Sequence, residues 1–184
     1  DVVMRVPNFY SDSVSRTQTS IAMRGAGSLE DSPGSDQAVA LFVDDVYIGE
    51  NSGLDFDFFD IERIEVLRGP QGTLFGRNTT AGIVKFDSIK PSDTWQGRVS
   101  ASYGSYGTVS VDGGFGGPVN DVLSFRVSAL YQHRDDWVDN TYSGPSADGT
   151  RTPKKDAMGG YDDRNASLQL LLKPSGNFSL LASA

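Results

Sequence analysis

A glycine-rich stretch behind a strand-like run is the part of this chain whose spacing comes nearest to a phosphate-binding site. Residues 68–82 read RGPQGTLFGRNTTAG. A phosphate loop needs a glycine, four residues and then Gly-Lys-Ser/Thr, so that backbone N–H groups and the lysine surround the phosphates. Here Gly72 and Gly76 are separated by three residues, and Arg77 and Asn78 follow. Because the glycine spacing is one residue too short and no lysine follows the second glycine, we predict a tightly turning loop and no nucleotide site.

The other residue types that carry chemistry are sparse. His133 is the only histidine, and the chain has no cysteine and no G-x-S-x-G elbow, so nucleophilic catalysis is not expected. An acidic run over residues 55–62 lacks the glycine and the terminal bidentate glutamate of a calcium-binding EF-hand loop. We interpret His133 as a polar residue at an interface and the acidic run as a solvated turn. The chain is therefore not expected to be an enzyme or to hold a metal or cofactor.

Composition narrows the remaining classes of protein. The 184 residues carry a net charge of -8, include 21 glycines, and are 38% hydrophobic and 10% aromatic. This balance favours a β-rich protein, and the negative charge argues against nucleic acid as a partner because phosphate contacts need a basic surface. The absence of cysteine excludes disulfides and thiolate metal sites. No apolar run is long enough for a membrane-spanning helix, so a membrane role would require a β-barrel.

The first half of the chain predicts a small sheet. Its strand candidates are residues 20–25, 38–49, 61–69 and 82–86. The second candidate has a continuous apolar core from Val39 to Val43, as expected where both faces of a strand are covered. Asp44 and Asp45, between two strand-like runs, predict a hairpin turn. Residues 55–63 are ambiguous between a turn and a short piece of helix.

The run IERIEVLR over residues 61–68 carries charge on both of its faces. With a period of two, one face holds Glu62, Ile64, Val66 and Arg68, and the other holds Ile61, Arg63, Glu65 and Leu67. In a soluble sheet that no wall surrounds, one of the two faces should be apolar and free of charged residues. A strand of this kind suits a small domain inside a polar wall, such as the lumen of a barrel, where charges on either face find partners.

After Pro91 the pattern changes to strict alternation in longer segments. The segments are residues 99–103, 109–115, 124–134, 164–174 and 177–184. In the third segment one face is mostly polar, and the other consists of Phe125, Val127, Ala129 and Tyr131. Residues 116–121 and 174–177 have the composition of tight turns, whereas residues 134–163 form a long insert. Short turns on one side and long loops on the other are typical of an outer-membrane barrel.

Two architectures fit this alternation. A strand of about 10 residues tilted by about 45° spans roughly 23 Å, close to the apolar band of about 25 Å in outer-membrane barrels. A soluble β-sandwich gives the same alternation and is commoner, so alternation alone favours it. Five strands cannot close a bacterial barrel. If the barrel is right, we expect the chain to be a fragment, in agreement with its start at Asp1 without methionine and its final strand ending in LASA.

Four ordered motifs resemble the TonB-dependent outer-membrane receptors of Gram-negative bacteria. They are residues 6–9 (VPNF), 21–25 (IAMRG), 41–49 (LFVDDVYIG) and, above all, 59–82 (FDIERIEVLRGPQGTLFGRNTTAG). In that family the last motif is the signature of the plug domain, a small mixed sheet held inside a 22-stranded barrel. Residues 102–121 also resemble the family's first barrel hairpin. The resemblance covers essentially the whole chain and reverses the preference for a sandwich.

The resemblance implies a β-rich chain in which an α+β plug, residues 1–93, precedes the first antiparallel strands of a 22-stranded transmembrane barrel, residues 96–184. It implies energy-coupled uptake of a scarce solute, namely a ferric siderophore, haem, cobalamin or an oligosaccharide, by a monomeric receptor in the cell outer membrane. The implied partners are the inner-membrane TonB complex, outer-membrane lipid and the small-molecule solute. A soluble β-rich binding or adhesion domain is the alternative.

The resemblance also singles out residues. Contacts between plug and barrel that hold or gate the plug are expected from Arg24, Glu62, Arg63, Glu65 and Arg68. The signature loop is marked by Gly69, Pro70, Gly72, Gly76, Arg77, Asn78 and Gly82. The chain departs from the family pattern at Asp44-Asp45, where members often have Asp-Gly, at Ala81-Gly82, where they have Gly-Gly, and at Lys85, where they have asparagine. These departures indicate a subgroup, and they do not name its solute.

Overall fold

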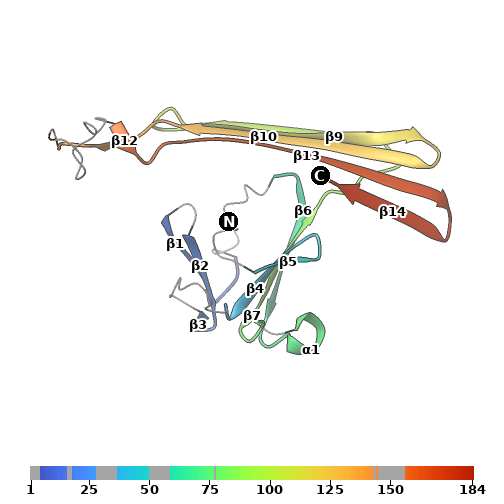
Figure 1. Cartoon of the computed structure of the whole chain (residues 1–184), viewed down its shortest axis with the longest axis horizontal. Helices are drawn as coiled ribbons and strands as arrows, with labels where there is room; N and C mark the ends of the chain where they lie inside the picture. The colour runs from blue at the N-terminus through green and yellow to red at the C-terminus, as the bar shows by residue number, and fades with distance from the viewer. Residues whose placement is uncertain are drawn as a thin grey trace. The chain divides into compact units, whose positions relative to one another are not determined.

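The structure, a computed structural model, describes residues 5–15, 18–27, 37–49, 59–76, 78–142, 144 and 156–184. The chain divides into two units, Asp1–Ile89 and Lys90–Ala184 (Figure 1). The limits expected from the sequence, 1–93 for the plug and 96–184 for the barrel strands, stay predictions of where the family's domains end and begin. Both units are built mainly from strands, so the β-rich fold is confirmed.

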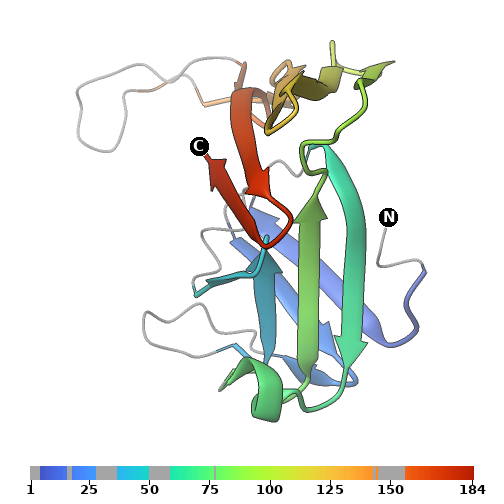
Figure 2. The ribbon, with the colours of Figure 1, turned by 90° about the vertical axis from the view of Figure 1, so that its right-hand side faces the viewer.

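The first unit contains a four-stranded mixed sheet. Its strands are β4 (Val39–Val43), β5 (Val46–Ile48), β6 (Ile61–Arg68) and β7 (Gly82–Ser88), in the order β5-β4-β7-β6 (Figure 2). β4 runs parallel to β7, whereas β5 pairs with β4 and β6 pairs with β7 in antiparallel fashion. β4 and β7 occupy the centre of the sheet and are the most buried of its strands, as their apolar runs predict.

A second, smaller sheet shares the main core with the first. It consists of β1 (Phe9–Ser15), β2 (Gln18–Met23) and β3 (Ala26–Gly27). The buried residues of the main core are Phe9, Met23, Val39, Leu41, Ala81, Val84 and Phe86. The opposite face of the mixed sheet holds a smaller cluster of Ala40, Phe42, Ile83, Leu67 and Phe75, of which Phe75 belongs to the single helical turn α1 (Gly72–Phe75). The alternation of the central strands thus separates a main core from a minor one.

A β-bulge in β6 changes the predicted division of its side chains. The register of β6 on β7 shifts between Ile61 and Arg63. Ile61 therefore packs on the main core together with Val66, and not on the face of Arg63. The uniform two-residue period predicted for residues 61–68 is wrong at this position, because the extra residue of a bulge re-aims one side chain.

The second unit is an antiparallel sheet of long strands (Figure 1). In the order β14-β13-β10-β9-β8 they are β14 (Phe178–Ser183), β13 (Tyr161–Ser175), β10 (Leu123–Arg134), β9 (Val109–Asn120) and β8 (Gln96–Tyr103). A short pair, β11 (Val138–Asp139) and β12 (Asp156–Met158), lies beyond the loop ends of β10 and β13. Within the described part of the chain, no helix is long and apolar enough to cross a membrane.

In this sheet the buried face is polar and the exposed face is apolar, which is the opposite of the arrangement in a soluble sheet. Along β10 the polar side chains of Ser124, Arg126 and Ser128 are only 3–5% exposed, whereas Val127 is 45% exposed. The apolar face continues on the neighbouring strands with the exposed side chains of Val99, Val111, Phe115, Leu168, Leu170 and Leu180. A sandwich would bury this apolar face, whereas a barrel wall directs it toward lipid. The exposed apolar face supports the barrel.

The tight turn predicted at residues 116–121 is present, but it lies later in the chain than predicted. β9 continues to Asn120, and the chain reverses only at Asp121 and Val122. Asn120 closes this turn, since its Oδ1 accepts hydrogen bonds from the backbone N–H groups of Val122 and Leu123 at 2.9 Å. Pro118 lies beyond Gly116, the last residue of β9 that pairs with β8, so β9 is an edge strand on that side, where proline is tolerated.

The predicted 134–163 insert is shorter at both ends than its composition indicates. Arg134 still pairs with Tyr161, so β13 already includes residues 161–163. The turn expected at residues 174–177 narrows in the same way, because β13 extends to Ser175. Polar and turn-forming residues remain in the strands here because long antiparallel ladders satisfy their backbone groups.

Two adjacent residues of β8 provide a test of the outward apolar face. Val99 is 81% exposed on the apolar face, and Ser100 is its neighbour on the polar face. Val99→Arg should destabilise the protein in lipid by about 2–4 kcal/mol if this face meets the bilayer, whereas Ser100→Arg should cost much less. Denaturant unfolding of the whole protein reconstituted in vesicles measures both. Equal, small effects of the two variants would contradict a lipid-facing surface.

Candidate functional site

The signature loop between β6 and β7 is closed by its own backbone. The N–H of Gly69 donates to the carbonyl of Ala81 at 2.8 Å, and that of Gln71 donates to the carbonyl of Thr79 at 3.0 Å. Thr79 is buried, and its hydroxyl donates to the carbonyl of Gly76 at 2.8 Å. α1 forms the tip of this loop, and the N–H groups of Phe75 and Gly76 are used inside it. The loop therefore reverses the chain between two antiparallel strands, as predicted. Arg77 lies outside the described residues.

Three glycines of the loop have backbone angles that favour glycine, namely Gly69 (φ 104), Gly76 (φ 81) and Gly82 (φ 152). Gly82 is also crowded, since a β-carbon there would collide with the carbonyl oxygen of Leu67 and the sulfur of Met23. Gly76, in contrast, has open space around it. Thus Gly82 is required by packing inside the first unit, whereas Gly76 is required by conformation alone.

The remaining positions of the loop differ in their surroundings. Gly72 opens α1 and has only the Thr79 hydroxyl near the place of a β-carbon, at 3.9 Å. Pro70 is exposed. Asn78 has a positive φ of 68, and its amide donates to the Tyr47 hydroxyl at 3.2 Å. Asn78 thus ties the loop to β5.

Two of the predicted arginines gather beside Gly69. Arg24 adopts a φ of 56 in the turn after β2, its backbone N–H donates to the carbonyl of Asn8 at 2.9 Å, and its guanidinium lies 3.5 Å from the place of a β-carbon on Gly69. The Arg68 guanidinium donates to the carbonyl of Pro7 at 3.5 Å. Motifs that lie far apart in the sequence therefore meet at one corner of the first unit. The side chains of Arg24, Arg68 and Glu62 are exposed.

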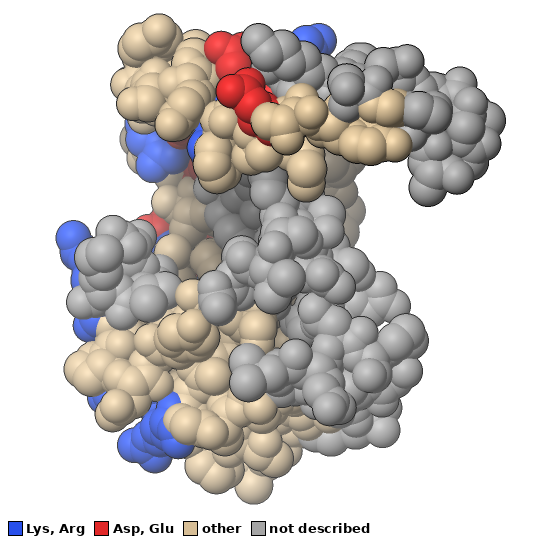
Figure 3. Space-filling view, turned by 90° about the vertical axis from the view of Figure 1, so that its left-hand side faces the viewer, with Lys and Arg blue, Asp and Glu red and all other residues tan. Residues whose placement is uncertain are grey.

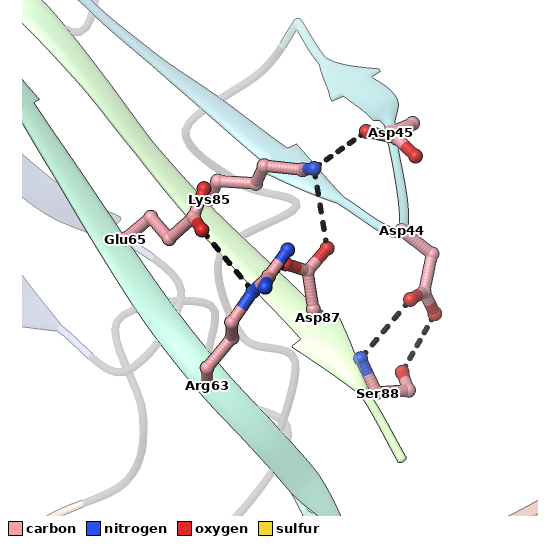
Figure 4. A network of polar contacts seen from close by, with 7 residues as sticks. All are labelled: Asp44, Asp45, Arg63, Glu65, Lys85, Asp87 and Ser88. Atoms are coloured by element: carbon pink, nitrogen blue, oxygen red, sulfur yellow. Dashed lines mark hydrogen bonds and ion pairs between the residues drawn. The ribbon is translucent and has the colours of Figure 1, made fainter. Parts of the chain in front are cut away.

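Arg63 and Glu65 belong to an ion network at the other end of the mixed sheet (Figure 4). Arg63 Nε lies 2.7 Å from Asp87 Oδ2 and 3.1 Å from Glu65 Oε1. Lys85 Nζ lies 3.3 Å from the other oxygen of Asp87 and 2.7 Å from Asp45 Oδ1. Charges of alternating sign therefore run from β6 across β7 to the turn between β4 and β5.

Asp44 closes the same end of the sheet. Its carboxylate accepts hydrogen bonds from the backbone N–H of Ser88 at 3.0 Å and from the Ser88 hydroxyl at 2.6 Å. Asp44 and Asp45 have φ angles of 48 and 68, so they form the predicted hairpin turn with both residues in the left-handed region. The turn is thus fixed to the end of the parallel neighbour β7.

The network controls the protonation of its central carboxylate. Burial raises the pKa of Asp87, but hydrogen bonds and charges from Arg63 and Lys85 outweigh burial, so that its pKa lies below the ordinary value. The hydrogen bond to Asp87 and the charge of Glu65 raise the pKa of Arg63. The hydrogen bond to Asp45 raises the pKa of Lys85 against the opposing effect of burial. At neutral pH the network is therefore held together by full charges.

Two departures from the family pattern are partners in this network. Asp45 and Lys85 are two of the positions at which the resemblance leads us to expect glycine and asparagine, and their side chains form the 2.7 Å ion pair. Sequence reasoning identified both positions but did not pair them. It missed Asp44, Asp87 and Ser88 as members of the site, because their proximity depends on the register of β4 on β7.

The basic side chains that the structure describes are spread over one face of the molecule. On the face shown in Figure 3, Lys and Arg side chains stand in separate groups with uncharged surface between them. Phosphate backbones need a continuous basic stripe. Among the described residues, no group of three or more His, Cys, Asp or Glu side chains is placed to hold a metal ion.

Comparison with known sequences identifies the first unit. Residues 1–83 match the TonB-dependent receptor plug domain. The pesticin receptor of Yersinia enterocolitica is 30% identical over 118 residues, which are 64% of this chain and 17% of that receptor. The iron-regulated outer membrane virulence protein of Vibrio cholerae is 33% identical over 93 residues, which are 47% of this chain and 14% of that protein.

Comparison with solved structures covers both units. The ferric yersiniabactin uptake receptor FyuA from Yersinia pestis aligns with 97% of this chain at a TM-score of 0.80 and 26% identity, and the match covers 27% of that receptor. The chain thus spans about a quarter or less of the lengths of these relatives. Its first unit is a TonB-dependent receptor plug domain, and the chain is similar over nearly its whole length to a TonB-dependent receptor of known structure.

The different surroundings of the loop glycines lead to a graded prediction. Gly82→Ala should destabilise the plug by about 2–4 kcal/mol through collision and strain. Gly76→Ala should cost about 1 kcal/mol through strain alone, and Gly72→Ala should be neutral or stabilising because alanine favours α1. Hydrogen exchange of residues 82–88 in the intact receptor measures the difference. A Gly76→Ala effect as large as that of Gly82→Ala would show that crowding is not what selects glycine at 82.

Acidification should loosen the networked end of the sheet. Because the pKa of Asp87 is depressed in the folded state, its stabilisation is complete above the unfolded value of about 3.9 and is lost as the pH falls through the folded value. Amide exchange of residues 63–65 and 85–88 in the receptor, corrected for intrinsic pH dependence, should therefore rise below about pH 4.

Two variants make this pH test specific. Asp87→Asn should exchange faster already at neutral pH and respond little to acid. Glu62→Gln, which removes an exposed carboxylate from the neighbouring strand β6, should keep the wild-type profile. An acid response that survives unchanged in Asp87→Asn would exclude Asp87 as its origin.

Proposed function

We propose that the receptor takes up a scarce solute across the outer membrane, with the plug gating the barrel and with energy supplied through the inner-membrane TonB complex. The observation that carries the proposal is the presence in one chain of a plug-family sheet and of long strands whose apolar side chains are exposed while polar ones are buried. A soluble binding or adhesion domain would have to leave this apolar face in water.

A ferric siderophore is the solute class that the comparisons favour. FyuA is described as a ferric yersiniabactin uptake receptor, and the relative from Vibrio cholerae is described as iron-regulated. Haem, cobalamin and oligosaccharides are the other classes that the family resemblance implies. The remaining partners in the proposal are outer-membrane lipid around a monomeric barrel and TonB on the periplasmic side.

The exposed charges of the plug are proposed to meet the barrel wall. Arg24, Glu62 and Arg68 have exposed side chains. Arg63 and Glu65 are bonded within the sheet, so their contribution to gating would pass through the ion network. A charge that is paired both inside the plug and with the wall would couple the shape of the sheet to the closed state of the receptor.

Uptake by the complete receptor tests the proposed function. Cells that carry it as their only uptake receptor, kept short of iron, are offered ferric siderophores and haem labelled with radioactive iron. We expect at least one compound to accumulate, accumulation to fall to background when the gene for TonB is deleted, and binding in the cold to persist. Accumulation that does not depend on TonB would refute energy coupling, and recovery of the receptor in the soluble fraction would refute the membrane function.

A further inference from the structure

We propose that two loops at the same end of the second unit move as one body. The first loop, residues 104–108, connects β8 to β9, and the insert base, residues 135–139 and 156–160, contains the short pair of β11 and β12. The link between them is one arginine that contacts an aromatic ring of each. This inference goes beyond the proposed uptake, because it concerns how the loops move whichever solute the receptor carries.

The first loop is a tight turn that needs support from outside itself. Tyr106 and Gly107 both lie in the left-handed region, with φ angles of 58 and 61. This conformation is easy for glycine but strains a bulky aromatic residue, which keeps it only where its surroundings hold it. Within the loop, the N–H of Gly104 donates to the carbonyl of Thr108 at 2.8 Å and closes the two ends. The conformation of Tyr106 therefore depends on a neighbouring segment.

That segment is the chain that follows β10. The backbone N–H of Asp135 donates to the carbonyl of Tyr106 at 2.9 Å. The Asp135 carboxylate occupies the place of a β-carbon on Gly107, and its other oxygen lies 3.3 Å from His133 Nε2. The insert base thus contacts both left-handed residues of the first loop, and a side chain larger than that of glycine does not fit at 107 while Asp135 stays in place.

The side chain of Arg134 joins the ring of Tyr106 to that of Trp137. Its guanidinium carbon lies 5.6 Å from the centre of each ring, and the two ring centres are 6.1 Å apart. A guanidinium at this distance is attracted to the face of an aromatic ring. Among the described residues, Arg134 Nε is buried without a hydrogen-bond partner. Contact with the two rings therefore holds this side chain in place.

Trp137 in turn is fixed to both strands of the insert base. Its N–H donates to the carbonyl of Met158 in β12 at 3.2 Å, and its indole occupies the place of a β-carbon on Gly159. The carboxylate of Asp136 accepts a hydrogen bond from the N–H of Gly160 at 2.9 Å. A displacement of the insert base must therefore carry the first loop with it or separate Trp137 from the arginine that joins the loops.

Hydrogen exchange of the complete receptor in detergent tests the link in both directions, since coupling between two sites is reciprocal. Trp137→Leu changes the insert base, and we expect exchange of the Gly104 and Thr108 amides in the first loop to rise by on the order of tenfold. Tyr106→Leu changes the first loop, and exchange of the Gly160 amide in the insert base should rise in turn.

A matched pair of arginines separates the link from general loosening. Arg164 also lies 5.6 Å from the centre of an aromatic ring, that of Tyr131, but this contact joins β13 to β10 within the sheet. Arg134→Gln should raise exchange in both loops at once, whereas Arg164→Gln should leave both at the wild-type rate. Arg134→Lys keeps a cation without the planar group, so it should lie between wild type and Arg134→Gln, and it serves if the glutamine variant does not fold.

Two outcomes would overturn the proposal. If Trp137→Leu and Tyr106→Leu each raise exchange only in the loop that carries the change, the loops move independently. If Arg134→Gln and Arg164→Gln have equal effects, Arg134 is not the link. Because exchange is measured without solute and without TonB, this result and the uptake result can fail separately.

Discussion

The plug sheet depends on the absence of a side chain at Gly82. The carbonyl oxygen of Leu67 and the sulfur of Met23 occupy the place of a β-carbon, so β2, β6 and β7 come together at one point. From this point β7 runs between β4 and β6 in fixed register, with Gly82 opposite Val39 on one side and opposite Arg68 on the other. This register brings Lys85 and Asp87 within reach of charges on both neighbouring elements, and the ion network follows from it.

The second unit obeys a different constraint. Its strands satisfy their backbone hydrogen-bonding groups in long antiparallel ladders. The polarity of the side chains on each face can therefore match the medium that this face contacts. The buried face carries serine, arginine and glutamine, and the exposed face carries valine, leucine and aromatic residues. The same two-residue period thus serves opposite purposes in the two units: it divides two apolar cores in the plug, and it separates polar from lipid-facing side chains in the barrel strands.

Much of the fold could be predicted from local pattern, and the errors share one cause. Features that depend on neighbours in the sequence were predicted correctly. They are the apolar run at Val39–Val43, the hairpin turn at Asp44-Asp45 and the alternation of residues 124–134. The bulge after Ile61, the continuation of β9 through Pro118, and the ion pairs of Lys85 depend on which strand lies alongside. Strand register is a property of two segments, and a single segment does not encode it.

The ion pair of Asp45 and Lys85 has a consequence for substitutions at either position. Asp45 holds a left-handed conformation that glycine adopts more easily, and Lys85 places an ammonium group that is largely buried beside β4. Either residue without the other leaves strain or an incompletely balanced charge, so the two replacements favour each other. A change at either position should therefore be tolerated better when the other position changes with it.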